Sequence, residues 1–452
     1  MFRIRCIALL GLFLGLGLQA LAQPAGEKDD PIARVLRRDQ TAPGGPPFGA
    51  SLPLAPAKPV PATGAGPSVG SNAGGNLPIV LSARIGEHED RTRFVIELSD
   101  PVNLRTFTLT GPDRVVVDMP EVAWRVGAPP RPSGFGSVKS YRYGVFRKGN
   151  SRMVIDLNRP VTVSDALVIP PSSGFGYRVV IDLFPTDRGK FNTNSGWPAD
   201  LKAREADAER LNALVAEGAK PSGRKIIVID PGHGGIDSGT NGVNGLLEKD
   251  LVLAEGLKLA KVLKAAGYAV HMTRDSDVFI PLPERVAIGR KLRADLMISL
   301  HADSNPDPDV NGLSVYTLND GRSDREAAAL AKRENQSDII AGVDLSNANS
   351  PVAPILIDLA QRDTINRSSR FAETALGQLK SATDILARSP HRAASLAVLV
   401  APDVPAVLIE LGYLSNRSDA IQMNTEAWRS RVAEAISSAV DRHFAAGPGT
   451  RP

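Results

Sequence analysis

The 452-residue chain has 42% hydrophobic and 23% charged residues, a composition that is typical of globular proteins and excludes a chain without a core. Its length is too great for one ordinary domain and predicts two or three folded units. The formal net charge of +4 is a mild basic bias, which would favour an anionic polymer of the cell envelope but does not indicate nucleic-acid binding.

The N-terminus has the pattern of a secretory signal. Two arginines in the first five residues precede an apolar run, residues 7–18, and Ala20-Leu21-Ala22 forms a small-x-small cleavage site. A run of about twelve apolar residues is too short to span a bilayer. We therefore expect export, cleavage after Ala22 and no stable membrane anchor afterwards. Cleavage also removes the single cysteine, Cys6, so the mature protein would have no disulfide, and it lowers the charge by two, from +4 to +2.

Two segments lack any hydrophobic period and are predicted to be linkers. Residues 23–76 are rich in Pro, Ala and Gly, which cannot bury enough apolar area to offset the entropy of ordering, so this segment should be a disordered tether. Residues 186–223 should form a second linker. It includes one polar helix, residues 200–216, whose interspersed charges favour a solvated spacer.

Residues 77–185 contain an internal repeat. The stretch Arg93–Val102 recurs as Arg152–Val161, and Arg114–Pro120 recurs with one added residue as Arg178–Pro185. The two offsets, 152 − 93 = 59 and 178 − 114 = 64, are similar enough to indicate one duplicated unit. Each copy is rich in Val and Ile, without helical spacing, which predicts an all-β sandwich of two similar sheets.

This β region resembles an AMIN domain, the non-catalytic module found in secreted cell-wall amidases and some pilus secretins. The resemblance rests on the strand pattern and the tandem position. It implies that residues 77–185 bind peptidoglycan and localise the protein to the division site.

From residue 224 onward strands and helices alternate. Such alternation predicts an α/β domain over residues 224–445, with a twisted, mostly parallel sheet flanked by helices and functional residues at the strand ends. The predicted strands are Ile226–Ile229, Tyr268–Met272, Asp295–Ser299, Gly312–Thr317, Ala397–Val400 and Ala406–Ile409, and the predicted helices are Lys249–Ala266, Pro283–Leu292 and Glu426–Phe444.

Three of these strands lead into side chains suited to metal chemistry. His233 lies in a glycine-rich turn after the first strand, His301 follows the third and Glu410 follows the last. A catalytic zinc site uses three protein ligands, so that water can hold the fourth position. Glu248, at the head of a predicted helix, fits the third ligand, although by itself it could be a helix acid favoured by the dipole.

Four stretches identify the family that this domain resembles. IDPGHGGIDSG, LEKD, SLHAD and APDVPAVLIELGYLSN occur in the order found in zinc-dependent N-acetylmuramoyl-L-alanine amidases of the cell-separation type. The resemblance implies that His233, Glu248 and His301 bind Zn²⁺. It also implies that Glu410 takes a proton from water and returns it to the leaving amine. The implied activity is hydrolysis of the bond between N-acetylmuramic acid and L-alanine during septal wall splitting, in the periplasm.

Some residues depart from the family pattern, and other readings stay open. Ser238, Thr240 and Val400 stand where the family usually has proline, alanine and a basic residue, which affects expected substrate contacts more than the metal. The alternatives are a zinc peptidase that cuts within the stem peptide and a catalytically inactive wall-binding regulator. His391 lies close enough to the final strands for a substrate-side role, although a structural role is the simpler interpretation.

The sheet pattern is interrupted at about residues 320–389, which is long for a connection and suggests a function. The interruption has a helical run, residues 323–340, and an apolar run, Val352–Leu359. In the amidases that this chain resembles, such an insertion covers the zinc, and the corresponding acid here is Glu334. A surface helix with Glu334 in solvent is the alternative. The resemblance also implies a LytM-type activator that binds residues 323–362, although the apolar run could equally be core.

Overall fold

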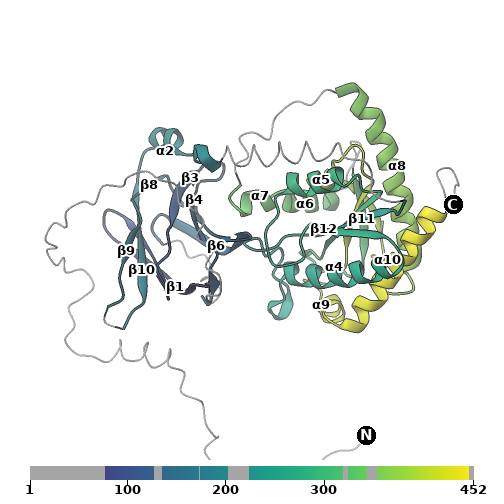
Figure 1. Cartoon of the computed structure of the whole chain (residues 1–452), viewed down its shortest axis with the longest axis horizontal. Helices are drawn as coiled ribbons and strands as arrows, with labels where there is room; N and C mark the ends of the chain where they lie inside the picture. The colour runs from purple at the N-terminus through teal and green to yellow at the C-terminus, as the bar shows by residue number, and fades with distance from the viewer. Residues whose placement is uncertain are drawn as a thin grey trace, which may run out of the picture. The chain divides into compact units, whose positions relative to one another are not determined.

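The first part of the described chain is built of strands, and the second alternates strands with helices (Figure 1). The computed structural model describes residues 77–126, 135–172, 174–201, 223–318, 324–343 and 354–446, without side chains at 244 and 354–361. The signal and tether expected over residues 1–76, and most of the polar helix expected at 200–216, therefore lie outside the described residues. Residues 74–452 form one compact unit, to which everything below belongs.

The N-terminal part is the β-sandwich expected from the repeat, with two sheets of unequal size. Apolar side chains from both sheets, such as Phe94 and Ile155, form one shared core. The larger sheet has the order β5-β1-β2-β10-β8, with β9 beside β10, and the smaller has the order β3-β4-β7-β6. The strands are β1 (Ile79–Glu87), β2 (Thr92–Leu98), β3 (Arg105–Leu109), β4 (Arg114–Pro120), β5 (Ala123–Trp124), β6 (Val138–Arg147), β7 (Asn150–Leu157), β8 (Val161–Val163), β9 (Leu167–Ile169) and β10 (Tyr177–Pro185).

Each sheet takes strands from both copies of the repeat. β2 pairs with β10 in one sheet, and β4 pairs with β7 in the other, all antiparallel. The repeat makes β2 equivalent to β7 and β4 equivalent to β10, so the same cross-strand ion pair occurs twice. Arg93 contacts Asp182 with two hydrogen bonds of 2.8 Å, and Arg152 contacts Asp118 with bonds of 2.6 and 2.8 Å.

The described part of the predicted second linker is folded onto the sandwich. Asp187 caps helix α2 (Arg188–Asn194) by accepting from the backbone of Lys190. Phe191 of this helix is 2% exposed and belongs to the sandwich core. The linker prediction is therefore wrong for residues 186–201, because one buried aromatic ring in a short polar helix gives no periodic signal.

The second part has a six-stranded sheet in the order β12-β11-β13-β16-β14-β15. All neighbouring strands are parallel except β14 and β16, which confirms the predicted mostly parallel sheet. The central strands are buried on both faces, so they are continuous apolar runs instead of alternating ones. The strands are β11 (Ile226–Pro231), β12 (Ala269–Met272), β13 (Leu296–His301), β14 (Ser314–Leu318), β15 (His391–Ala394) and β16 (Ala406–Glu410).

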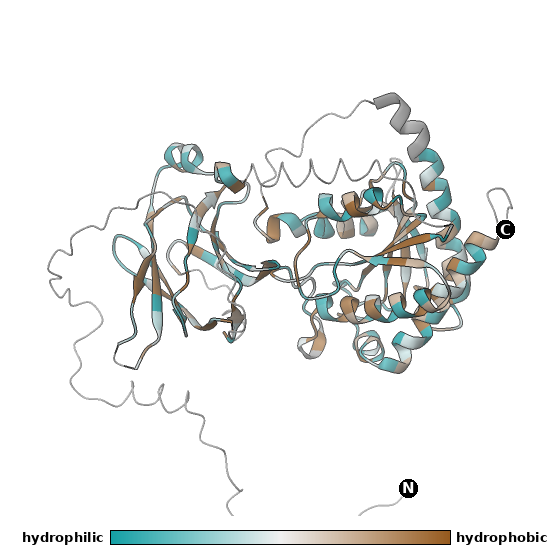
Figure 2. Ribbon diagram, viewed as in Figure 1, coloured by the Kyte–Doolittle hydropathy of each residue, from teal (hydrophilic) through white to brown (hydrophobic). Residues whose placement is uncertain are grey.

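Helices cover both faces of this sheet. One face packs against α4, α8, α9 and α10, and the other against α5, α6 and the 3₁₀ turn η2. Figure 2 shows the hydrophobic residues concentrated in the strands and the hydrophilic residues on the outer sides of the helices. No helix among the described residues is long and apolar enough to cross a membrane. The bounds are η1 (Val243–Gly245), α4 (Glu248–Ala265), α5 (Leu282–Lys291), α6 (Arg325–Glu334), α7 (Ser337–Ile340), α8 (Pro354–Leu379), η2 (Ala397–Leu399), α9 (Arg417–Met423) and α10 (Glu426–Ala445).

Three predictions around the interruption need correction. The strand predicted at Ala397–Val400 is a 3₁₀ turn, and the edge strand is β15, because a four-residue apolar run cannot distinguish a strand from another buried segment. The helical run predicted at 323–340 divides into α6 and α7, since Asn335 ends α6. The long helix α8 was missed, and its Phe371 and Leu376 lie in the sheet core, so the later part of the interruption is scaffold.

Candidate active site

The predicted ligands meet at one edge of the α/β sheet. β11, β13 and β16 are adjacent and parallel, so their carboxyl ends lie together. His233 follows β11, while His301 and Glu410 are the last residues of β13 and β16 and are paired in register. Glu248, the first residue of α4, completes the group. All four side chains are buried.

His233, Glu248 and His301 form a compact set of metal donors. One ligand atom from each lies within 4.8 Å of the others. Glu248 Oε1 lies 3.1 Å from His233 Nε2 and 3.2 Å from His301 Nδ1. Its carboxylate is held by the backbone N–H groups of Ala302 and Thr240, at 2.9 and 2.8 Å. The set has the two nitrogens and one oxygen that suit a catalytic zinc.

Neighbouring carboxylates make this site attractive to a cation. Burial alone would lower the pKa of His233, but the carboxylates of Glu248, Asp237 and Glu334 raise it well above its ordinary value. The same competition, with Glu334 as the strongest partner, raises the pKa of His301 to about 10. The negative charge around the two rings therefore favours either bound protons or a metal ion at this position.

The loop around His233 depends on glycine. His233 has a φ of 58°, an uncommon conformation for a residue with a side chain. A Cβ on Gly232 would lie 2.3 Å from the ring of His301, and one on Gly239 would lie 2.6 Å from the ring of His233. The glycines of the turn thus let the backbone approach the two imidazoles closely.

Asp237 orients the first imidazole. Its Oδ2 lies 2.9 Å from His233 Nδ1, which places the proton on Nδ1 and leaves the lone pair of Nε2 for a metal. His233 Nε2 is buried and has no hydrogen-bond partner, as expected for an atom prepared for a ligand. Asp237 also accepts a hydrogen bond from Ser337 of α7. The backbone carbonyl of His233 accepts from the buried Arg285 at 2.6 Å.

Glu410 has a different environment from Glu248. Burial raises the pKa of its carboxyl well above the usual range, and although His301 opposes this, the nearby carboxylates of Asp303 and Glu248 raise it further. Its Oε2 accepts from the backbone N–H of Asp303 at 3.0 Å, whereas Oε1 is buried and has no partner. One oxygen is therefore fixed, and the other is available to exchange a proton with a bound molecule.

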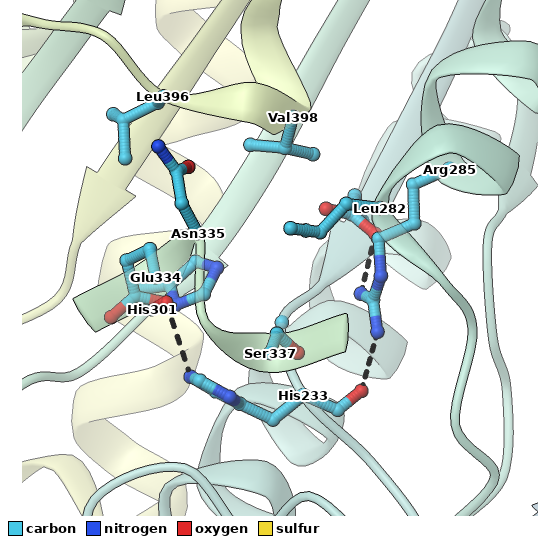
Figure 3. Close-up of a pocket in the computed structure, with 11 residues that line it drawn as sticks. His233, Leu282, Arg285, His301, Glu334, Asn335, Ser337, Leu396 and Val398 are labelled. Atoms are coloured by element: carbon cyan, nitrogen blue, oxygen red, sulfur yellow. Dashed lines mark hydrogen bonds and ion pairs between the residues drawn. The ribbon is translucent and has the colours of Figure 1, made fainter. Parts of the chain in front are cut away.

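Helix α6 places a glutamate carboxylate against the two histidines of the donor set. Glu334 Oε2 lies 3.0 Å from His301 Nδ1 and 3.4 Å from His233 Nε2. Figure 3 shows Glu334 beside the two imidazoles. The residue before Glu334 on the helix, Arg333, pairs with the buried Asp303. Arg333 Nε donates to the Asp303 carboxylate at 3.1 Å. The small pocket over the two histidines is lined by Asp230, Gly232, His233, Leu282, Arg285, His301, Glu334, Asn335, Ser337, Leu396 and Val398.

The sequence analysis did not identify Asp237, Asp303 or Arg285 as site residues. Asp237 and Asp303 lie within four residues of a predicted histidine ligand, in the same loops, and this proximity was the available signal. Arg285 had no such signal, because it reaches the loop from a distant helix. His391 lies on edge strand β15 and not in a loop, and it hydrogen-bonds Thr317 at 3.2 Å, apart from the cluster.

The structure describes the surroundings of two of the positions that depart from the family pattern, Thr240 and Val400. Thr240 donates its backbone N–H to Glu248 and its hydroxyl to Asp303, at 2.8 and 3.3 Å. Val400 is 45% exposed. The replacement at 240 thus adds a hydroxyl bond to Asp303, whereas the backbone bond to Glu248 would also form with alanine, and the replacement at 400 leaves an apolar side chain on the surface.

Two family models match the chain. Residues 227–442 match the N-acetylmuramoyl-L-alanine amidase model, and residues 82–183 match the AMIN domain model. The first match contains all of the candidate site residues, and the second falls within the β-sandwich.

Curated proteins of similar length align with both parts. The chain is 34% identical over 379 residues to N-acetylmuramoyl-L-alanine amidase AmiC of Neisseria meningitidis, covering 81% of this chain and 90% of the relative. It is 33% identical over 380 residues to AmiC of Escherichia coli, with the same two coverages. Among solved structures, AmiC2 of Nostoc punctiforme is 29% identical, with a TM-score of 0.36, and the match covers 50% of this chain and 99% of that one.

Proposed function

Because the chain belongs to the N-acetylmuramoyl-L-alanine amidase family, we propose that it is a peptidoglycan hydrolase with a zinc centre at His233, Glu248 and His301. The bond it cleaves joins N-acetylmuramic acid to the L-alanine of the stem peptide, the reaction named for its relatives. The observation that carries the proposal is the buried donor set beside Glu410, at adjacent strand ends.

The residues of the donor set fit zinc. His233 would bind through Nε2, because Asp237 holds the proton on Nδ1. Glu248 would bind as a carboxylate, since its pKa is lowered well below the usual value by the two imidazoles despite its burial. A zinc ion held there would polarise the scissile carbonyl and lower the pKa of water toward neutrality.

Glu410 would move the proton during hydrolysis. A buried carboxylate with a raised pKa can take a proton from the attacking water and give it to the leaving amine of L-alanine. The hydrogen bond from the Asp303 backbone fixes Oε2 of the carboxylate, while Oε1, which has no hydrogen-bond partner, would exchange the proton. No covalent intermediate is required.

Glu334 would hold the enzyme in an inactive state. Its position against both histidines makes it a fourth protein ligand, and a site with four protein ligands has no open position for water. Arg333 fixes the same helix to Asp303. An activator of the LytM type, bound to residues 323–362, would then withdraw the helix and shift the population to the open state.

The location of the enzyme is proposed from its N-terminal half. The match to the AMIN domain model supports peptidoglycan binding by the sandwich. We propose that the protein is exported by a signal cleaved after Ala22 and acts at the septum in the periplasm, which agrees with wall binding. The alternative of a stem-peptide peptidase is not favoured, because the relatives are named as amidases.

The experiment separates the proposed roles by measuring metal and product together. Glu410→Ala should keep its zinc and lose at least about 100-fold in rate, because the residue moves protons and does not hold the metal. His233→Ala should lose both zinc and activity. Metal analysis and mass spectrometry of digested sacculi would check this, with intact stem peptides as the expected product. A Glu410→Ala protein without zinc, or wild-type products cut within the stem, would contradict the assignment.

A further inference from the structure

The backbone of α7 and of the residues just after it is held by arginines of the β-sandwich. We call residues 337–343, which follow the helix that carries Glu334, the docked turn. Arg114 donates to the carbonyl of Ile339 at 2.5 Å, and Arg142 donates to that of Ile340 at 2.5 Å. Arg152 donates to the carbonyl of Gly342 at 3.0 Å. The last carbonyls of a helix need such partners, and charged donors supply strong ones.

The arginines are fixed before they meet the turn. Asp118 binds Arg152 with both oxygens, and the guanidinium lies 3.6 Å from the ring centroid of Phe146. Asp156 accepts from Arg142 at 2.5 Å. Because the acids position these donors, little side-chain entropy is lost when the turn docks.

The same sheet also contacts the loop that carries His233. Phe146 stacks on Phe279, and Ile236 lies in the same apolar cluster as Ala341 of the docked turn. The approach is so close that a Cβ on Gly144 would lie 2.6 Å from the backbone of Gly235. One face of the β3-β4-β7-β6 sheet therefore touches both the candidate metal loop and the docked turn.

The repeat shows that these contacts are not required by the sandwich itself. Arg93 and Asp182 reproduce the Arg152–Asp118 pair in the other sheet, and Arg178 is the counterpart of Arg114. Arg178 donates to Ser172, in the loop between β9 and β10 of the sandwich itself. The ion pair is thus common to both sheets of the sandwich, whereas the bonds to the docked turn come from the β3-β4-β7-β6 sheet.

We propose that this face of the sandwich, with Arg114, Arg142 and Arg152, is the docking surface that keeps the occluding segment in the active site. This inference rests on the proposed occlusion by Glu334 and adds a second inhibitory element. The sandwich, in addition to its wall-binding role, holds the turn against the metal loop. Loss of the contact releases α6 and α7 from the site.

The first test changes the docking surface in the full chain. Arg142→Ala removes one bond to the turn from a residue whose side chain is 23% exposed, so the fold should tolerate it. Amide hydrogen exchange of residues 337–343, measured by mass spectrometry, should be about tenfold faster, and peptidoglycan hydrolysis should be faster than in wild type. The matched controls Arg93→Ala and Arg178→Ala, in the other sheet of the sandwich, should leave both the exchange and the hydrolysis rate unchanged.

A second variant changes the turn and leaves the sandwich intact. Gly342 has a φ of 69°, and a Cβ there would lie 3.0 Å from Val154 and 3.2 Å from Val116. Gly342→Val should therefore displace the turn and give the same faster exchange and faster hydrolysis. Gly149→Val is its control, because Gly149 also has a positive φ, 82°, but has no neighbour within 4 Å of the added Cβ.

Exchange and hydrolysis distinguish the two proposals. If exchange in residues 337–343 is the same in Arg142→Ala, Gly342→Val and wild type, the docking surface is overturned. Faster exchange and faster hydrolysis confined to these two variants support the docking surface. If their exchange is faster but their hydrolysis is not, while Glu334→Ala hydrolyses faster than wild type, the turn contacts the sandwich without holding the occluding segment, and the proposal is overturned. If the rate then stays at the wild-type level, and Glu334→Ala is also no faster, the occlusion by Glu334 is overturned instead.

Discussion

Two buried glutamates show how environment separates chemical roles. Glu248 and Glu410 are both inaccessible to solvent, yet their pKa values move in opposite directions. Two imidazoles contact Glu248 and keep it ionised, as a metal ligand must be. Glu410 has more acidic neighbours and is driven toward its protonated form. Such pairs of groups with divergent pKa values identify the acid–base residue of a site.

A third buried glutamate, Glu255, makes stability depend on pH. It lies in α4 with neither carboxyl oxygen hydrogen-bonded, and burial raises its pKa from 4.5 to about 8. Because the folded-state pKa is the higher one, the stabilising effect of the protonated form is complete below about pH 4.5. It is lost as the pH rises through about 8.

Glu255→Gln should remove this pH dependence. We expect the variant to be roughly 4 to 5 kcal/mol more stable than wild type at pH 9 and nearly equal at pH 4.5, since the two pKa values differ by 8 − 4.5 = 3.5 and one pKa unit corresponds to about 1.4 kcal/mol. Urea unfolding at the two pH values measures the difference. Glu434→Gln, at an exposed position of α10, is the control and should follow wild type. Equal stabilities of Glu255→Gln and wild type at pH 9 would show that the buried carboxyl is not destabilising.

At the scale of an element, α6 is built to aim an acid inward. Ala327, Leu330 and Ala331 are its buried apolar residues, and Glu334 continues the same face at the i+7 position. Asp324 caps the helix by accepting from Ala327 N–H. Packing of the apolar stripe on the sheet therefore carries Glu334 to the histidines.

Glu334→Ala should raise basal activity without any partner protein. Removing this fourth protein ligand would open a position for water, and we expect at least about a tenfold faster release of stem peptides from sacculi. Zinc content should be retained. Glu326→Ala, on the exposed side of the same helix, is the matched control and should not differ from wild type. A folded, zinc-containing Glu334→Ala protein that is no faster than wild type would be evidence against occlusion by this residue.

At the scale of the whole molecule, the sandwich continues past the repeat. α2 contributes Phe191 to the sandwich core, and Arg188 of this helix pairs with Asp113 at 2.6 Å. Trp197 then packs against Phe107. The folded unit therefore continues past residue 185, through the described residues up to 201.

A fragment of residues 77–201 should be more stable than one of residues 77–185. Loss of a buried phenylalanine costs about 3 to 5 kcal/mol, which should lower the melting temperature by at least about 10 °C in a domain of this size. Thermal unfolding followed by circular dichroism measures the difference, and Phe191→Ala in the longer fragment should reproduce most of it. The longer fragment should also pellet with sacculi. Equal melting temperatures would place the boundary at residue 185 after all.

The sequence by itself determined the features that depend on local pattern. The duplicated strands predicted the sandwich, the alternation of strands and helices predicted the sheet, and apolar runs that end in polar residues predicted His233, His301 and Glu410. Such patterns are readable because a buried parallel strand must be apolar along its length and can place functional groups only at its end. The resemblance of the four stretches added the family, which the comparisons confirmed.

Only the tertiary structure decided what depends on residues distant in the chain. It brought Arg285 to the His233 loop, placed Phe191 in the sandwich core and paired strands from different copies of the repeat. It also set Arg114, Arg142 and Arg152 against carbonyls about 200 residues later, at separations of 225, 198 and 190. Backbone carbonyls have no sequence signature, because every residue carries one. Which arginine meets which carbonyl is therefore fixed by packing of the sheet on the turn, and no periodicity could reveal it.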